Sequence, residues 1–182
     1  FDVVYLKNFN GGPNDRDQVV AALRDYVRSG GGLLLNYRQN WFGESPFPEI
    51  AKIPEQGETY EGTLTVTEAS DTLSSVAEGT RYRPYYPLYL AFEPGPAGTV
   101  LVEDMAGRAV FVAGTLGRGR VIFAGQNFPR PSEVRNHFDK PPEELNHPGI
   151  EVFFNENKHY PDGTERTVLL DLAAWLADIR KE

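Results

Sequence analysis

Residues 25–37 read DYVRSGGGLLLNY, and this stretch decides the fold class. Its three glycines, at positions 30–32, end a helical pattern, because one of them can adopt the left-handed conformation that follows many helices. The next residues, Leu33, Leu34 and Leu35, form a continuous apolar run, which is typical of a strand covered by helices on both faces. The stretch therefore predicts a helix followed at once by a buried strand.

The residues before this stretch complete a strand-helix-strand unit. Over 15–29 the apolar residues recur at helical spacing, and over 2–6 the sequence DVVYL predicts a strand. The segment 8–14 is rich in Asn, Gly and Pro and predicts a loop, with Asn14 as the residue that caps the helix. A helical connection of this length makes the two strands parallel, with a right-handed crossover.

The second half of the chain adds further strands and a final helix. Strands are expected at 99–103, 109–113 and 120–124, and the last two are joined by the glycine-containing turn 115–119, which predicts an antiparallel pair. A helix over 165–180 follows. We therefore predict an α/β fold, with a mainly parallel sheet flanked by helices and an appended antiparallel strand pair.

The remaining segments have weaker patterns. Residues 62–68 alternate as a half-exposed strand does, and 70–77 predict a short helix. Aromatic residues over 82–92 are interrupted by prolines, which predicts an irregular loop or edge strand; the rings either fill a core or form a sugar platform or partner surface. Residues 128–164 show no repeating pattern and predict a long irregular excursion, either functional or mobile.

Composition and charge exclude several functions. The 182 residues carry a net charge of −8, which argues against nucleic acid as a partner because phosphate binding needs clustered Lys and Arg. No apolar run approaches the ~20 residues of a membrane span, so no membrane insertion is expected. The chain has no cysteine, which removes disulfides, thiolate metal sites and cysteine nucleophiles. Cytoplasmic and extracytoplasmic locations both suit such a chain, with the extracytoplasmic one slightly favoured.

Three runs, taken in their order along the chain, carry a family resemblance. They are FDVVYLKNFN (1–10), DYVRSGGGLLLNY (25–37) and GTLGRGRVIFAGQNF (114–128). Together they resemble the class I glutamine amidotransferase-like superfamily, especially its non-glutaminase branch of ThuA-like (trehalose-utilisation) proteins. The resemblance covers about two thirds of the chain and implies a flavodoxin-like sheet.

The resemblance also implies that a strand-helix unit precedes the first strand of this sequence. We therefore expect residues 1–182 to form a single amidotransferase-like domain that lacks its first strand-helix unit, and Phe1 in place of Met fits a piece of a longer chain. An apolar strand edge left open in this way recruits another strand. An upstream segment or a protein partner is expected to cover residues 3–6.

The residues that perform the glutaminase reaction in this superfamily are absent. The resemblance places the catalytic cysteine in the turn after 33–35, where this sequence reads NYRQ. It places the companion histidine after the strand at 121–124, where the sequence reads GQNFP, and the Gly-His of ThuA-like relatives is not matched either. An amide, a phenol or a guanidinium does not replace a thiolate nucleophile, so glutaminase activity is excluded.

The candidate ligand site lies where the parallel strands end, because loops and helix N-termini converge there in open α/β sheets. The residues at these strand ends are mostly uncharged amides, a set suited to hydrogen-bonding and stacking against sugars or other polar neutral molecules. The alternative is that the amides satisfy backbone groups of their own loops. The candidate ligand-binding residues are Asn8, Asn10, Asn36, Arg38, Gln39, Asn40, Trp41, Gln126 and Asn127.

The three histidines of the long excursion are candidate metal ligands. They are His137, His147 and His159, and with neighbouring carboxylates they would suit zinc, iron or manganese. Their spacing matches no compact ligand motif, so exposed loop histidines are the favoured alternative. We expect no catalytic residue and no cofactor.

Three functions are compatible with these observations. The favoured one is a non-catalytic binding or scaffold module, with a carbohydrate as ligand, within a larger protein or assembly, because the nucleophile and the base are both missing. The second is a carbohydrate-active ThuA-like enzyme, a sugar or keto-sugar isomerase or hydrolase that uses histidine, carboxylate or a metal. The third is a secreted or surface structural subunit.

Overall fold

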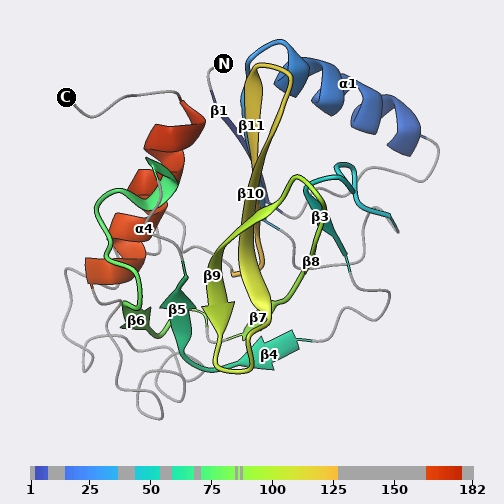
Figure 1. Cartoon of the computed structure of the whole chain (residues 1–182). Helices are drawn as coiled ribbons and strands as arrows, with labels where there is room; N and C mark the ends of the chain where they lie inside the picture. The colour runs from blue at the N-terminus through green and yellow to red at the C-terminus, as the bar shows by residue number, and fades with distance from the viewer. Residues whose placement is uncertain are drawn as a thin grey trace, which may run out of the picture.

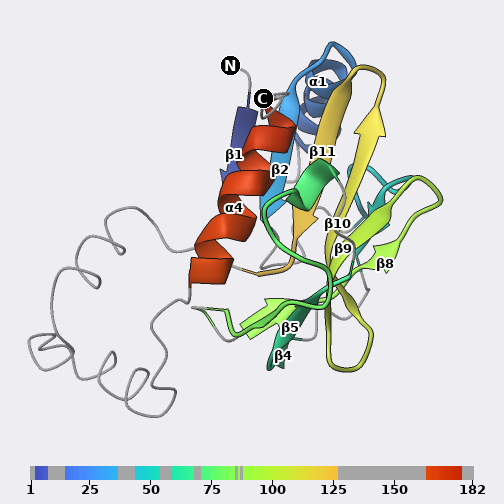
Figure 2. The same ribbon diagram turned by 60° about the vertical axis from the view of Figure 1, so that its left-hand side comes forward.

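A seven-stranded sheet forms the centre of the fold (Figures 1 and 2). The computed structural model describes residues 3–7, 15–36, 44–53, 59–67, 71–84, 86, 88–126 and 163–177. The strands of this sheet are β1 (Val3–Lys7), β2 (Gly32–Asn36), β5 (Leu64–Val66), β6 (Arg81–Tyr82), β9 (Thr99–Asp104), β10 (Ala109–Leu116) and β11 (Gly119–Ala124). Across the sheet they follow the order β1-β2-β11-β10-β9-β5-β6.

Helices and short strand pairs surround the sheet. The helices are α1 (Arg16–Arg28) and α4 (Gly163–Leu176), and the 3₁₀ turn η1 is Asp71–Leu73. The short pairs are β3 (Ala51–Lys52) with β8 (Glu93–Pro94), and β4 (Thr59–Glu61) with β7 (Leu88–Leu90). Within the described ranges, no helix has the length and apolar character needed to cross a membrane.

The predicted strand-helix-strand unit is confirmed. β1 pairs in parallel with β2, which pairs in parallel with β11, and Leu34 lies in register between Tyr5 and Ile122. α1 makes the connection from β1 to β2, and Gly30, just after it, has a φ of 118°, in the region that favours glycine. The N-cap position of α1 is Asp15, whose side chain makes no capping hydrogen bond; the expected cap Asn14 lies outside the described residues.

The predicted antiparallel pair is also confirmed, and the sheet continues beyond it. β10 and β11 are antiparallel neighbours with Val112 opposite Phe123, and β9, β5 and β6 extend the sheet in alternating directions. Because the directions alternate, β9 and β6 point the same way as β1, β2 and β11. Five of the seven strands therefore share one direction, in a mixed α/β fold.

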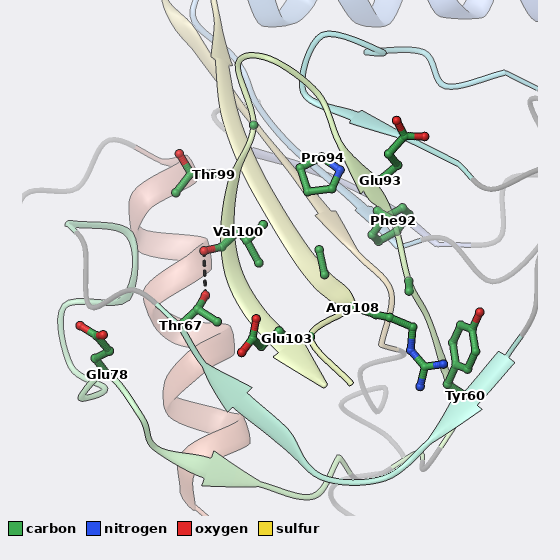
Figure 3. A pocket seen from close by; sticks show the side chains of 14 residues that line it. Tyr60, Thr67, Glu78, Phe92, Glu93, Pro94, Thr99, Val100, Glu103 and Arg108 are labelled. Carbon is green, nitrogen blue, oxygen red and sulfur yellow. Dashed lines mark hydrogen bonds between the residues drawn. The ribbon is translucent and has the colours of Figure 1, made fainter. Parts of the chain in front are cut away.

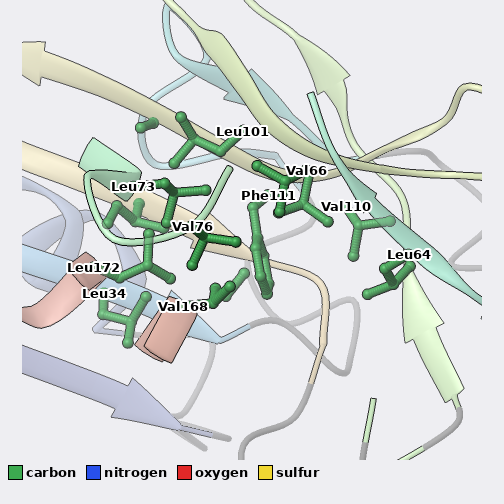
Figure 4. Close-up of a cluster of buried hydrophobic side chains, with 14 of the residues drawn as sticks. Leu34, Leu64, Val66, Leu73, Val76, Leu101, Val110, Phe111, Val168 and Leu172 are labelled. Atoms are coloured by element: carbon green, nitrogen blue, oxygen red, sulfur yellow. The ribbon is translucent and has the colours of Figure 1, made fainter. Parts of the chain in front are cut away.

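Both faces of the central strands are buried, as the apolar run predicted. Leu34 packs in one cluster with Leu172 of α4 (Figure 4), whereas Leu33 packs in a second cluster with Val27 of α1. Neighbouring strand residues point to opposite faces, so α4 and α1 cover opposite faces of the sheet. Each fully buried Leu or Val contributes roughly 1.5–3 kcal/mol.

The weaker predictions have mixed outcomes. The strand expected at 62–68 is the shorter β5, and in place of the short helix expected at 70–77 there is the single turn η1. Tyr82, Tyr89 and Phe92 are buried, so these rings fill the core, one of the two alternatives. Of the excursion expected at 128–164, residues 128–162 lie outside the described residues.

Candidate functional site

The carboxyl ends of β2 and β11 lie side by side, at the place where the sequence predicted a ligand site. Asn36 is the last residue of β2, and Gln126 follows two residues after the end of β11. The first turn of α4 reaches the same edge through Glu165. Asn36 and Gln126 lie close together because β2 and β11 are parallel neighbours, and Glu165 joins them from α4.

Asn36 connects the two strand ends. Its side chain is buried, with 5% exposure for the residue, and its Nδ2 donates to the main-chain oxygens of Ala124, at 3.4 Å, and Gln126. Its Oδ1 is buried and accepts no hydrogen bond from the described residues. The amide nitrogen is therefore used inside the fold, whereas the amide oxygen has no partner in the described part of the chain.

Gln126 connects the edge to two further elements. The residue is fully buried, its Oε1 accepts a hydrogen bond from the Tyr82 hydroxyl at 3.2 Å, and its Nε2 donates to Glu165 Oε1 at 2.5 Å. Glu165 is itself only 3% exposed. We call Asn36, Tyr82, Gln126 and Glu165 the edge cluster; it ties β2, β6, β11 and α4 together.

The chemistry of the edge cluster is that of a structural connection. Its side chains are amides, a phenol and one carboxylate, and none of them is a thiol or an imidazole. Asn36 and Gln126 make hydrogen bonds inside the fold, but to the neighbouring strand segment and to the side chains of Tyr82 and Glu165, not to their own loops. Seven of the candidate residues lie outside the described residues: Asn8, Asn10, Arg38, Gln39, Asn40, Trp41 and Asn127.

Sequence reasoning did not find Tyr82 or Glu165. Tyr82 belonged to the aromatic segment and Glu165 to the expected start of a helix, and neither pattern shows that they meet Gln126. The candidate metal ligands His137, His147 and His159 lie outside the described residues. Within the described part of the chain, no group of three or more His, Asp or Glu is arranged to hold a metal ion.

A separate pocket of about 930 Å³ lies over β9, between β8 and the turn that joins β9 to β10 (Figure 3). Its walls come from β4, β8, β9 and β10 and from the turn near Glu78. They combine charged, hydroxyl and aromatic side chains. The charged and hydroxyl residues that line the pocket are Thr67, Glu78, Glu93, Thr99, Glu103 and Arg108.

Arg108 is held in place at this pocket by Asp104 and Tyr60. Its Nε and Nη2 each lie 2.6 Å from Asp104 Oδ2, and its guanidinium carbon lies 3.4 Å from the centre of the Tyr60 ring. Asp104 also accepts hydrogen bonds from the Ala106 and Arg108 main-chain N–H groups and from the Tyr89 hydroxyl. These contacts hold the Arg108 guanidinium in one orientation.

The surroundings of Asp104 and Tyr89 shift the pKa values of both side chains. Burial alone would raise the pKa of Asp104, but the hydrogen bonds from Arg108 and Ala106 and the positive charge of Arg108 hold that pKa below its usual value. Burial, followed by the negative charge of Asp104, raises the pKa of Tyr89 to about 12. Tyr89 therefore stays protonated at neutral pH and donates a hydrogen bond to Asp104.

Comparison with known proteins identifies the fold. No family model matches the sequence, and no curated protein matches it. A glutamine amidotransferase from Thermotoga maritima superposes over 98% of this chain and 79% of its own, with a TM-score of 0.56 and 9% identity. The fold is amidotransferase-like.

A second solved structure is similar over a smaller part. It is the cytoplasmic protein STM1381 from Salmonella typhimurium LT2, with a TM-score of 0.56 and 16% identity over 76% of this chain. The match spans 65% of STM1381, less than two thirds of its length. At these identities the comparisons support the fold alone.

The lowered pKa of Asp104 predicts a specific acid dependence of stability. Because the folded pKa lies below the unfolded one, the stabilisation is present above about pH 4 and is lost as the pH falls through the folded pKa. Asp104→Asn should lower the free energy of unfolding by about 1–3 kcal/mol at pH 7, and by less as the pH falls below about 4. Urea unfolding from pH 7 to pH 2 measures this, with Asp25→Asn on the exposed side of α1 as matched control. An Asp104→Asn deficit that is the same at pH 7 and pH 2 contradicts the assignment.

Proposed function

We propose that this chain is a binding or scaffold module built on the amidotransferase-like fold, without glutaminase chemistry, and related to the ThuA-like branch. The observation that carries the proposal is the edge cluster. It fills the strand ends with hydrogen-bonded amides, where the resemblance places the nucleophile and base of catalytic relatives.

The last residue of β2, Asn36, is unsuited to the place of a nucleophile. A catalytic thiolate has to meet its substrate, whereas Asn36 is buried and donates to two main-chain oxygens of the neighbouring strand segment. The chain has no cysteine that could act instead. The edge therefore supports the fold and does not attack a carbonyl.

A polar neutral molecule, such as a carbohydrate, is the ligand proposed for this edge. The support is the buried Oδ1 of Asn36, which accepts no hydrogen bond from the described residues; a buried acceptor without a partner is costly, and a ligand hydroxyl would satisfy it. The other candidate ligand-binding residues, which lie outside the described residues, stay predictions from the sequence. Amide side chains of this kind hydrogen-bond neutral ligands without adding charge.

A carbohydrate-active enzyme is the second candidate, and the buried carboxylate of Glu165 is the observation that favours it. A buried carboxylate at a strand edge is a common general acid or base. Its Oε1 is bound by Gln126, which ties it to a structural role at the same time. Conversion of a sugar by the chain, lost in Glu165→Gln, would favour this candidate over the module.

A strand from a partner is proposed to cover β1. In the described part of the chain β1 is the edge strand of the sheet. Tyr5, in the middle of β1, is 42% exposed. An apolar edge strand with unpaired backbone groups pairs readily with another strand.

Hydrogen exchange tests this partner proposal. We expect slow exchange of the β1 amides that point away from β2, together with a species larger than a monomer in light scattering, because a covering strand protects those amides. A stable monomer in which the same amides exchange fast would refute the proposal.

The absence of glutaminase activity is the direct test of the proposed function. The purified chain should release no ammonia from L-glutamine above a heat-treated sample, because neither the thiol nor the late histidine is present. A catalytic glutamine amidotransferase assayed in parallel shows that the assay works. Ammonia release that scales with the concentration of this chain would overturn the proposal.

A further inference from the structure

We propose that the pocket over β9 binds a neutral saccharide, a molecule with many hydroxyl groups and without phosphate or carboxylate. The proposal rests on the binding role argued above. It places a ligand in the antiparallel part of the sheet, away from the strand ends of β2 and β11.

The size of the pocket suits a small saccharide. Its volume of about 930 Å³ lies within the range of small-molecule sites, roughly 300–1,000 Å³. Figure 3 shows side chains from β9, from β8 and, with Arg108, from the turn that precedes β10 along its walls. Phe92 forms an apolar part of one wall, and its main-chain N–H is fixed to Ala109 O at 2.8 Å.

Arg108 supplies fixed hydrogen-bond donors. A guanidinium has five N–H groups, and among the described residues Arg108 uses its Nε and Nη2 side on Asp104. The Tyr60 ring supports the guanidinium from its face. Because the side chain is already ordered, a ligand hydroxyl that accepts from its remaining N–H groups costs little additional side-chain entropy.

Carboxylates and hydroxyls supply the acceptors. Glu78 and Glu103 line the pocket and form no ion pair with the described residues, so their oxygens can accept from ligand hydroxyls. The Thr67 hydroxyl donates a hydrogen bond to Val100 O at 2.8 Å, which leaves its oxygen as an acceptor. Sugar hydroxyls both donate and accept, so they match a wall that carries fixed donors and acceptors together.

The charge of the pocket selects a neutral ligand. Three glutamates and one arginine line it; Asp104 balances the arginine, and Lys52 lies 3.4 Å from Glu93, so Glu78 and Glu103 leave the wall negatively charged. A phosphate or carboxylate would therefore meet net repulsion. A polyamine would be attracted by the glutamates but would leave the donors of Arg108 without acceptors, at a cost in free energy.

The test uses the whole chain and four probes. D-glucose and maltose are titrated by calorimetry and thermal shift, with glucose 6-phosphate and spermidine as the anionic and cationic probes. We expect a rise in melting temperature with at least one neutral sugar, and binding of glucose 6-phosphate at least about tenfold weaker. Binding of no neutral sugar, or preference for either charged probe, overturns the proposal.

Variants locate the site. Glu103→Gln and Arg108→Lys should each weaken sugar binding about tenfold, which is the effect of losing roughly one good hydrogen bond to a charged group. Glu61→Gln, an exposed glutamate of β4 outside the pocket, is the matched control and should bind as the unaltered chain does. Circular dichroism establishes that each variant is folded before it is titrated.

A variant of the strand edge separates this proposal from the proposed function. Asn36→Ala should leave sugar binding in the pocket unchanged. If Asn36→Ala abolishes binding while Glu103→Gln and Arg108→Lys retain it, the ligand lies at the strand edge: the pocket proposal is then wrong, and the ligand proposed for the edge is supported. Ammonia release from glutamine, by contrast, would overturn the proposed function and leave the pocket result standing.

Discussion

Burial of β2 and β11 on both faces is the constraint on which the rest of the structure depends. α1 covers one face and α4 the other, so every residue of β2, from Gly32 to Asn36, is buried. A polar side chain at the end of such a strand is removed from water and has to find its hydrogen bonds inside the fold. Asn36 and Gln126 do so through main-chain oxygens, a phenol and a carboxylate.

The parallel and antiparallel halves of the sheet use their polar residues differently. In the parallel half, the polar residues that the structure describes are used to join β2, β6, β11 and α4. In the antiparallel half the pocket over β9 remains open between β8 and the β9–β10 turn, and Arg108 is held at its wall by Asp104. A shared fold does not fix function. In this chain the described polar residues of the edge cluster bond one another or the main chain, and the proposed saccharide pocket is separate from this edge.

The sequence predicted the elements that have a strong local pattern. The triple glycine and the leucine run gave the order helix, stop and buried strand, and the turn at 115–119 gave the antiparallel pair. A strand was expected around β5, but β5 and β6 have only three and two residues, too few for a periodic signal that would show how they pair at the end of the sheet. Asn36 and Gln126 were found because strand ends are visible in sequence. The partners of Gln126, Tyr82 and Glu165, are 44 and 39 residues away from it along the chain, and only tertiary packing brings them together.

A double-mutant cycle between Gln126 and Glu165 tests most directly whether the edge cluster is structural. The free energy of unfolding in urea is measured for Gln126→Leu, Glu165→Leu, the double variant and the exposed control Gln18→Leu on α1. Each single change at the cluster should destabilise the fold by about 1–3 kcal/mol, because it leaves a buried polar partner unsatisfied. The double variant should cost less than the sum of the two by about 1 kcal/mol or more, whereas Gln18→Leu should change stability by no more than about 0.5 kcal/mol. Effects that add within about 0.3–0.5 kcal/mol would contradict the account, because two side chains that hold the strand edge together through one hydrogen bond have to be coupled.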